Sequence, residues 1–185
     1  MAKVKVLIEG YTSGETGGHS CSTIVLVEDK NIKMIVDPGT LPDQKLLTEK
    51  LKEAGLNIES INVVCITHSH MDHYRNIGMF PKAKALDYWG WWEGDVWKKG
   101  EAKITENIKI INTPCHSDDN ITLLVKTKKG VVAICGDVFW KENFPKDDPY
   151  ASNKKKLKQS RKKILQIADW IIPGHGKMFK NPTKR

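Results

Sequence analysis

One short segment dominates this sequence: Thr67-His68-Ser69-His70-Met71-Asp72-His73. It reads H-x-H-x-D-H and places four side chains that can bind metal within six positions. The chain has only six histidines, and three of them lie here, a concentration that random placement would rarely produce. The segment therefore predicts a metal site, because imidazole and carboxylate groups together suit zinc, manganese or iron.

Further candidate ligands follow downstream. His116 and His175 lie in loops marked by proline or glycine, and Asp137 lies between them in the pair Gly136-Asp137. One tetrahedral zinc uses four ligands. The larger set therefore predicts two metals in one site, which can generate hydroxide at neutral pH and clamp a reacting centre. The candidate metal ligands are His68, His70, Asp72, His73, His116, Asp137 and His175.

Length and composition bound the class of protein. The 185 residues, of which 39% are hydrophobic, predict a single globular domain over residues 1–185. No run approaches the ~20 consecutive apolar residues of a membrane helix, so we expect no membrane association. Residues 1–6 alternate polar and apolar like a strand and lack the features of a signal peptide. We therefore expect the protein in the cytoplasm.

The four cysteines contain no C-x-x-C pair. Cys65 and Cys135 lie in apolar, strand-like runs, which predicts buried, reduced thiols. Cys115 directly precedes His116 and could act close to the site or serve as a small packing residue. Packing is favoured, because most free cysteines behave as small apolar residues.

The apolar pattern predicts strands in both halves of the chain, at residues 4–8, 23–28, 33–36, 61–67, 109–112, 121–126, 131–135 and, as the last one, 170–172. Apolar residues between positions 46 and 54 recur at helical spacing, which predicts a helix that Gly55 ends. A longer helix is expected at residues 153–168, and residues 87–100 are interpreted as a loop. Candidate ligands thus follow strands in both halves, which predicts one site between two sheets.

Five segments, taken in order, resemble the metallo-β-lactamase-fold hydrolases over nearly the whole chain. They are Val36-Asp37-Pro38-Gly39, the H-x-H-x-D-H run, Thr113-Pro114-Cys115-His116, Gly136-Asp137 and Pro173-Gly174-His175-Gly176. Each alone is a weak signal, but all of them in this order are specific. The resemblance implies an α/β fold (α+β in some classifications), namely a four-layer αββα sandwich with metals at the edge between two sheets. Within the family, the chain is most similar to small stand-alone members.

The resemblance also implies a role for each matching residue. The first metal would be bound by His68, His70 and His116. The second would be bound by Asp72, His73 and His175, with Asp137 bridging both. Asp37 would support the ligand loop without binding metal, because metal-binding histidines need partners that orient them.

Three positions refine the comparison with the family. Position 70 is histidine and not the glutamate of di-iron flavoprotein relatives, which favours two zinc ions, with Mn²⁺ or iron as alternatives. Cys115 replaces the glycine of the usual T-P-G-H motif and could narrow the site. Asp137 stands where zinc β-lactamases carry cysteine, which argues against antibiotic resistance as the native role.

The expected function is that of a dinuclear metal-dependent hydrolase, in which a metal-bound hydroxide attacks a small ester, thioester, lactone or amide. Asp72 and Asp137 would be the catalytic carboxylates, with Asp72 orienting the hydroxide or receiving its proton. The net charge of +8 and the basic residues 154–163 also suit a metal-dependent nuclease acting on RNA. A solvated amphipathic helix is the simpler interpretation of that segment. A non-catalytic metal-binding protein is the third alternative.

Residues outside the ligand set could contact a substrate. His19 lies in the glycine-rich loop 14–20, which in this family often borders the pocket. Trp89, Trp91 and Trp92 could line a pocket for an apolar or flat substrate. They could equally pack in the core or form a homodimer contact. A small molecule is the expected partner, and nucleic acid is the less favoured one.

Overall fold

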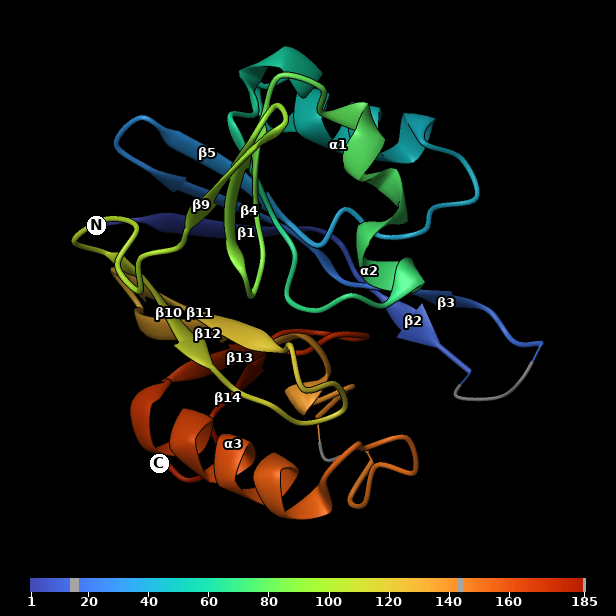
Figure 1. Ribbon diagram of the computed structural model, residues 1–185, viewed down its shortest axis with the longest axis vertical. Helices are drawn as coiled ribbons and strands as arrows, with labels where there is room; N and C mark the ends of the chain where they lie inside the picture. Colours follow the sequence, from blue (N-terminus) through green and yellow to red (C-terminus); the bar gives the residue numbers. More distant parts are fainter. Residues whose placement is uncertain (14–16, 143–144, 185) are drawn as a thin grey trace.

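The computed structural model describes residues 1–13, 17–142 and 145–184. Its elements form four layers, with α1 (Lys45–Glu53) on one side, two β-sheets in the middle and α3 (Lys154–Ile167) on the other side (Figure 1). The predicted αββα sandwich is therefore confirmed. No helix within the described ranges is long and apolar enough to cross a membrane.

The first sheet comes from the N-terminal half of the chain and has seven strands in the order β1-β4-β5-β6-β7-β8-β9. Strands β1, β4 and β5 pair antiparallel, whereas β5, β6 and β7 run parallel to one another. The two strands predicted at residues 23–28 and 33–36 form a hairpin, β4 and β5, that turns through Lys30, whose φ is 54°. The strands are β1 (Lys3–Ile8), β4 (Ile24–Asp29), β5 (Ile32–Val36), β6 (Val63–Cys65), β7 (Lys84–Leu86), β8 (Gly90–Glu93) and β9 (Val96–Lys99).

The second sheet comes from the C-terminal half and has five strands in the order β10-β11-β12-β13-β14. Neighbours pair antiparallel except β12 and β13, which are parallel. The strand at residues 170–172 is not the last one, because β14 follows; its two residues are too few to show a period in the sequence. The strands are β10 (Ile108–Asn112), β11 (Ile121–Thr127), β12 (Gly130–Ile134), β13 (Trp170–Ile172) and β14 (Phe179–Lys180).

Apolar side chains fill the three spaces between the layers. Successive residues of a strand point to opposite faces. Val25 therefore packs between the two sheets, while Leu26 packs toward α1. Leu47 and Leu51 of α1 are fully buried against that outer face, and burial of each leucine contributes about 1.5–3 kcal/mol. The space between the second sheet and α3 is filled in the same way, by Leu124, Ala133, Leu157, Ile164 and Ile171.

Both long helices begin and end close to the predicted residues. The side chain of Asn153 accepts a hydrogen bond from the backbone nitrogen of Lys156 at 3.0 Å and so caps the N-terminus of α3. Gly55, with a φ of 75°, follows the last turn of α1. The shorter elements are the ribbon β2 (Tyr11–Thr12) and β3 (Ser20–Cys21), the helix α2 (Met71–Tyr74), and the 3-10 helices η1 (Ile58–Ser60), η2 (Arg75–Met79) and η3 (Gly136–Val138).

The segment 87–100 contains a β-hairpin, so its prediction as a loop is wrong. Strands β8 and β9 pair antiparallel around Gly94-Asp95, with Trp92 opposite Trp97. The sequence shows no alternation because β8 carries tryptophan on both of its faces. A Cβ at Gly90, whose φ is 147°, would lie 2.3 Å from the carbonyl oxygen of Lys98, which explains why glycine stands there.

The strands that precede the candidate ligands all end at one edge of the sandwich. In the first sheet, the parallel strands β5 and β6 lead to Asp37 and His68. In the second sheet, β10, β12 and β13 share one direction and lead to His116, Asp137 and His175. The backbone nitrogen of Ile121 donates to the carbonyl oxygen of Thr67 at 2.8 Å and joins the two sheets there. Two halves of the chain thereby present their polar side chains to the same space.

Candidate metal centre

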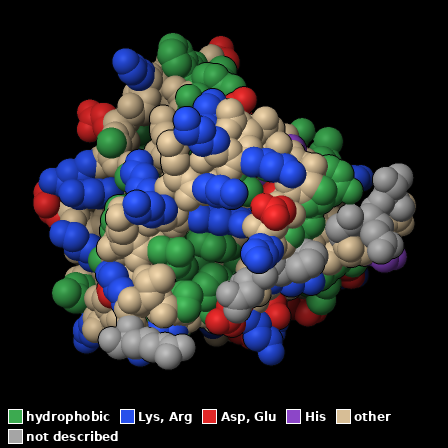
Figure 2. All heavy atoms as spheres, turned by 90° about the horizontal axis from the view of Figure 1, so that it is seen from below, with side chains coloured by type: hydrophobic (Ala, Val, Ile, Leu, Met, Phe, Trp, Pro, Cys, Tyr) green, Lys and Arg blue, Asp and Glu red, His purple; other side chains and the backbone are tan. Residues whose placement is uncertain are grey.

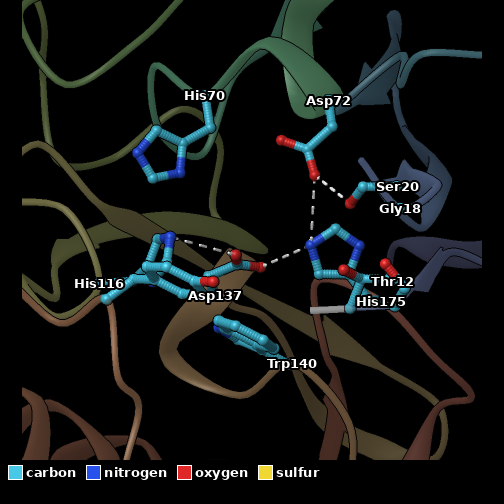
Figure 3. Close-up of a pocket in the computed structure, with 11 residues that line it drawn as sticks. Thr12, Gly18, Ser20, His70, Asp72, His116, Asp137, Trp140 and His175 are labelled. Atoms are coloured by element: carbon cyan, nitrogen blue, oxygen red, sulfur yellow. Dashed lines mark hydrogen bonds and ion pairs between the residues drawn. The ribbon is translucent and has the colours of Figure 1, made fainter. Parts of the chain in front are cut away.

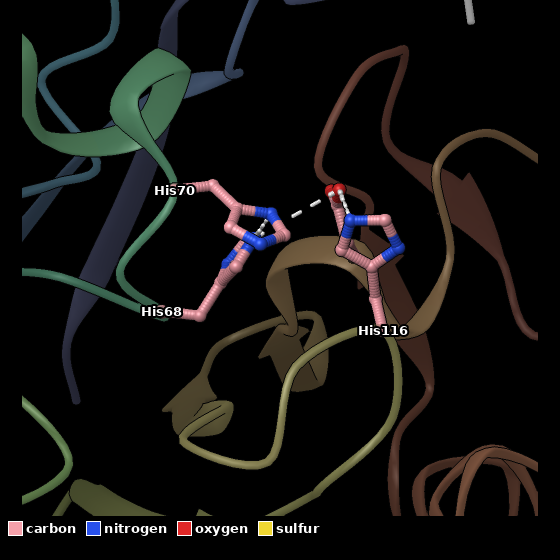
Figure 4. Close-up of side chains that lie close together, drawn as sticks. His68, His70 and His116 are labelled. Atoms are coloured by element: carbon pink, nitrogen blue, oxygen red, sulfur yellow. Dashed lines mark hydrogen bonds and ion pairs between the residues drawn. The ribbon is translucent and has the colours of Figure 1, made fainter. Parts of the chain in front are cut away.

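The candidate ligands form two groups at this edge, and in each group the ligand atoms lie within 4.8 Å of one another. Figures 3 and 4 show the labelled side chains turned toward a common space from loops of both sheets. The first group is His68, His70, His116 and Asp137, and the second is Asp72, His73 and His175. The structure therefore brings together every residue that the sequence analysis selects as a ligand, and metal binding by them stays a prediction.

In the first group, ring nitrogens of different histidines converge. His68 Nε2 lies 3.0 Å from His70 Nδ1. The rings of His70 and His116 pack edge to face, with their centroids 4.6 Å apart. Burial, followed by the neighbouring His73, lowers the pKa of His68 well below its ordinary value. Burial and the neighbouring His116 also lower the pKa of His70. Both imidazoles are therefore held neutral, which is the form that binds metal.

Asp137 lies between the two groups and turns one oxygen toward each. Its Oδ2 is 3.9 Å from Nε2 of both His68 and His116, whereas its Oδ1 is 3.4 Å from His73 Nε2 and 3.3 Å from His175 Nε2. Burial would raise the pKa of Asp137, but the charges of His175 and His73 outweigh burial and hold it well below its ordinary value. The carboxylate is thus ionised in a buried place, where it needs cationic partners.

Two buried polar atoms of the candidate ligands indicate whether a metal fits this site. His73 Nε2 and Asp137 Oδ1 have no hydrogen-bond partner among the described residues. Unpaired polar atoms are rare in a protein interior, and both of these atoms face the other ligands. Imidazole nitrogen and carboxylate oxygen are also the donor types that zinc accepts. The residues present therefore fit a divalent metal.

Asp37 belongs to neither ligand group but supports them through hydrogen bonds. Its carboxylate accepts hydrogen bonds from the backbone nitrogen and the hydroxyl of Thr67, both at 2.7 Å, and lies 2.8 Å from Nδ1 of His73. Burial alone would lower the pKa of His73, but the charges of Asp37 and Asp137 outweigh burial and raise it well above its ordinary value. Asp37 has a φ of 51°, a conformation that non-glycine residues rarely adopt and that clusters at functional sites.

Two glycines leave the space that Asp137 and its neighbour Thr67 occupy. At Gly136, whose φ is 51°, a Cβ would lie 2.5 Å from Thr67 Oγ1. At Gly174, a Cβ would lie within bonding distance of Asp137 Oδ1, at 1.9 Å. A side chain at position 136 would displace Thr67, and a side chain at position 174 would displace the Asp137 carboxylate. The motifs Gly136-Asp137 and Gly174-His175 therefore have a packing reason as well as a chemical one.

A pocket of about 390 Å³ opens over the ligands. Its lining is mixed in character, because Thr12, Ser13 and Ser20 contribute hydroxyl groups and Trp140 and Tyr150 contribute rings. His70, Asp72, His116, Asp137 and His175 line it as well. Its volume lies within the range of small-molecule sites.

Comparison with known proteins places this site in a family. A model of the metallo-beta-lactamase superfamily matches residues 16–113. The chain is 30% identical to metallo-beta-lactamase domain-containing protein 1 of Xenopus laevis, over 96% of this chain and 81% of that protein. The chain belongs to the metallo-β-lactamase superfamily. The predicted likeness to small stand-alone members is thereby confirmed.

Two further similarities lie within the same superfamily. The chain is 25% identical to the hydroxyacylglutathione hydrolase GloC of Haemophilus influenzae, over 85% of each protein. Its structure is similar to that of a metallo-β-lactamase homologue from Thermotoga maritima, with a TM-score of 0.78 and 26% identity over 97% of this chain and 99% of that one. The Haemophilus influenzae relative is named as a hydrolase, and members of this superfamily are mostly metal-dependent hydrolases.

Three of the candidate ligands, His116, Asp72 and His175, are oriented by groups that the sequence does not reveal. Asp148 is fully buried, and its Oδ2 lies 2.9 Å from Nδ1 of His116. Burial would lower the pKa of His116, but this hydrogen bond and the charge of Asp137 raise it. Ser20 donates its hydroxyl hydrogen to Asp72 at 2.5 Å, and His175 Nδ1 lies 3.0 Å from the carbonyl oxygen of Cys21. These contacts span 32 to 154 residues of chain, so no local spacing indicates them.

The residues selected as substrate contacts lie elsewhere. His19 is exposed and borders a neighbouring hollow with Thr40 and Leu41, whereas Gly18 and Ser20 on either side of it line the metal pocket. Successive residues of an extended segment point in opposite directions, which explains why His19 turns away. The residues Gly14, Glu15 and Thr16 of the same loop lie outside the described residues.

The tryptophans of the β8–β9 hairpin do not line the metal pocket either. Trp91 packs against the core between the sheets and borders a separate hollow with Lys84 and Lys98. Trp89 and Trp92 are exposed, by 54% and 40%. A substrate contact at the metal site therefore has no support from their positions, because the hairpin carries them along an edge of the first sheet. The homodimer contact stays a prediction.

Cys115 does not narrow the site. Its side chain is fully buried and packs in the cluster that lies between the second sheet and α3. Burial raises the pKa of this thiol to about 12, so the thiol is protonated at neutral pH. The interpretation of Cys115 as a packing residue is confirmed, and so is the burial of Cys65 and Cys135.

Proposed function

We propose that the protein is a dinuclear, zinc-dependent hydrolase that uses water to cleave a small ester, thioester, lactone or amide. The observation that carries this proposal is the position of Asp137, whose two oxygens face two separate sets of imidazole nitrogens. A carboxylate in that position suits two cations better than one. Residues 1–185 would supply the whole site as one domain.

Within this proposal, His68, His70 and His116 hold the first metal, and Asp72, His73 and His175 hold the second, with Asp137 shared. When bound, the metals supply hydroxide at neutral pH and draw electron density from the scissile carbonyl. The protein contributes neutral imidazoles at His68 and His70 and an ionised carboxylate at Asp137. Zinc is preferred because histidine supplies most of the donor atoms, and Mn²⁺ or iron would be the alternatives.

Asp72 is the carboxylate best placed to handle a proton. It lines the pocket and is half-buried, and Ser20 fixes one of its oxygens at 2.5 Å. A fixed carboxylate beside the reacting centre can orient the attacking water and accept its proton. Asp137 is more deeply buried and serves to hold charge between the two groups.

The size of the pocket and one relative narrow the substrate. A cavity of about 390 Å³ matches the size of sites that hold a small molecule. The similarity to a hydroxyacylglutathione hydrolase supports acyl thioesters as the first substrates to test. Esters, lactones and amides share the same electrophilic carbonyl and belong on the same panel.

The test is a metal analysis followed by turnover assays. We expect about two zinc ions per chain, and cleavage of at least one acyl thioester, ester or lactone that chelation abolishes and zinc restores. His116→Ala should lower both the metal content and the turnover. The matched control is His19→Ala, which removes an exposed histidine outside both groups and should change neither. Two metals without turnover on any substrate would favour the non-catalytic alternative.

A second candidate is a metal-dependent nuclease acting on RNA, and helix α3 is the observation that favours it. The helix carries seven lysine or arginine residues and no acidic residue. Lysines occupy its first turn, where the helix dipole disfavours cations. Lysine and arginine side chains gather on the face of the molecule that α3 forms (Figure 2). Among these residues, the side chains of Lys154, Lys155, Lys158 and Lys162 make no hydrogen bond or ion pair with the described part of the chain.

Part of this charge has a structural role, which keeps the nuclease in second place. Arg161 donates to the carbonyl oxygens of Val138, Pro145 and Lys146 at 2.8–2.9 Å, and Lys156 pairs with Asp118 at 3.0 Å. A nuclease should cleave labelled RNA with a rate that falls steeply as salt rises. Replacing the four unpaired lysines by glutamine should weaken that cleavage. The matched control replaces four exposed lysines of other layers by glutamine, namely Lys3, Lys5, Lys45 and Lys52.

A further inference from the structure

The pocket contains an aromatic pair that neither the ligand motifs nor the family comparison assigns. The rings of Trp140 and Tyr150 are stacked, with centroids 5.9 Å apart and planes 12° from parallel. Trp140 is 5% exposed, whereas Tyr150 is 54% exposed. Both line the pocket over the ligands. A buried ring therefore backs an accessible one.

The pair contacts the candidate ligands directly. The ring of Trp140 packs edge to face against His116 and against His175, with ring centroids 5.5 Å and 6.4 Å apart. It therefore contacts one histidine of each ligand group. Tyr150 also meets His116 edge to face, at 6.1 Å. Figure 3 shows Trp140 directly beside Asp137 and His175. A substrate group that stacks on this aromatic pair therefore lies next to the candidate metal ligands His116 and His175.

One buried carboxylate positions both the ligand and the ring. Asp148 Oδ2 lies 2.9 Å from His116 Nδ1, and its Oδ1 accepts a hydrogen bond from the backbone nitrogen of Tyr150 at 2.8 Å. The orientation of His116 and the position of Tyr150 are thereby set by the same side chain. Such a shared support holds a contact residue at a fixed distance from the reacting centre.

The rest of the pocket lining includes polar groups. Thr12, Ser13, Gly18 and Ser20 contribute hydroxyl and backbone groups to it. A substrate that fits this lining has a polar part and a flat apolar part. Aromatic pairs in stacked or edge-to-face arrangements contribute about 0.5–1.5 kcal/mol beyond the area that they bury.

We propose that Tyr150, backed by Trp140, determines substrate specificity by stacking on a flat, aromatic acyl group next to the scissile carbonyl. This proposal rests on the proposed hydrolase function and names its substrate class: arylacetyl thioesters or esters. Aliphatic acyl groups of the same size would bind in the same place with lower affinity.

The experiment compares two substrates whose acyl groups differ in whether the six-membered ring is flat. Phenylacetyl and cyclohexylacetyl thioesters of one thiol have acyl groups of nearly equal size, but only phenylacetyl is flat. We expect the zinc-loaded enzyme to favour phenylacetyl by about 3- to 10-fold in kcat/KM, the range of an aromatic pair. Tyr150→Ala should remove this preference mainly through KM, and Tyr150→Phe should keep it. Tyr88→Ala is the matched control, because Tyr88 is 40% exposed and lies outside the residues that line the pocket.

A binding measurement separates this proposal from the proposed function. Calorimetry of the zinc-loaded protein with phenylacetate and with cyclohexylacetate reports stacking without any turnover. Tighter binding of phenylacetate that Tyr150→Ala abolishes would support the aromatic wall, even if no thioester is cleaved. Equal binding of both acids, or a preference that Tyr150→Ala leaves intact, would overturn it while the hydrolase stands.

Discussion

The ligand edge and the β8–β9 hairpin are both conspicuous in the sequence, the first for its histidines and the second for its tryptophans. They differ in how their side chains lie. At the ligand edge, His68, His73 and Asp137 are at most 4% exposed and converge from the loop after β6, helix α2 and the 3-10 helix η3. On the hairpin, Trp92 and Trp97 are exposed by 40% and 50% although they pair across β8 and β9. Side chains on an edge hairpin face solvent, whereas side chains that follow strands of both sheets converge on one buried space.

This difference predicts that substitutions at the ligand edge alter metal binding and that substitutions on the hairpin do not. The largest effect is expected for Asp137→Ala. It removes the one carboxylate that faces both groups, so turnover should fall well beyond the roughly 10- to 100-fold cost of losing an outer hydrogen-bond partner. Metal content per chain and kcat/KM measure the effect. Asp95→Asn in the hairpin turn is the matched control, and unchanged turnover in Asp137→Ala would count against the proposed site.

Metal removal should produce the next largest effect. Ligands that bind only the folded state stabilise it by about 4 kcal/mol at a thousand times their Kd. Chelation should therefore lower Tm by several degrees, and added zinc should restore it. His116→Ala, which disrupts one group, should show a smaller loss. A Tm that chelation leaves unchanged would mean that the ligand edge is stable without metal.

The two supporting carboxylates allow the two ligand groups to be distinguished. Asp148→Asn should weaken metal binding at the group with His116, and Asp37→Asn at the group with His73, each by roughly 10- to 100-fold. Competition with a chromophoric chelator measures both affinities. Asp29→Asn is the control, because Asp29 is equally buried but bonds Thr105 and Asn107 instead of a histidine. Loss of both metals in both variants would indicate a single cooperative site.

The metal-free protein should lose stability as the pH rises above about 6.5. The pKa values of His73 and His116 are raised in the folded state, so their contribution is complete below the unfolded value of about 6.5 and is lost as the pH rises through the folded values. His68 and His70, whose pKa values are lowered in the folded state, contribute in the opposite sense near the unfolded value of about 6.5 and no longer contribute once the pH lies well above it.

Urea denaturation at several pH values, with chelator and with zinc, measures this dependence. In the zinc-loaded protein the sign should reverse, because metal binding requires deprotonated histidines and strengthens as the pH rises. Equal slopes with and without zinc would contradict the assignment of His73 and His116 as ligands.

The smallest effect is expected on the hairpin. Trp97→Ala removes the partner of Trp92 across β8 and β9, and cross-strand pairs contribute about 0.2–1 kcal/mol. The free energy of unfolding should fall by that amount, with metal content and turnover unchanged. A loss of turnover would show that the hairpin reaches the substrate.

Much of the fold could be predicted because its signals are local. The hairpin of β4 and β5 follows from two apolar runs around residues 29–31, and helix α3 begins one residue after the predicted start at residue 153. The hairpin at 87–100 could not be predicted, because tryptophans on both faces of β8 conceal the alternation on which strand prediction depends.

The sequence by itself determined which donor atoms this protein can offer to a metal. Residue types and short spacings are enough for that, and the family motifs then distribute the ligands between two groups. Only the tertiary structure decided what surrounds those atoms. Asp148 contacts His116 across 32 residues, Trp140 and Tyr150 form one wall, and His19 turns away from the pocket. These relations depend on where strands end and how loops return, because the physical distance between distant residues is set by packing and not by their separation in the chain.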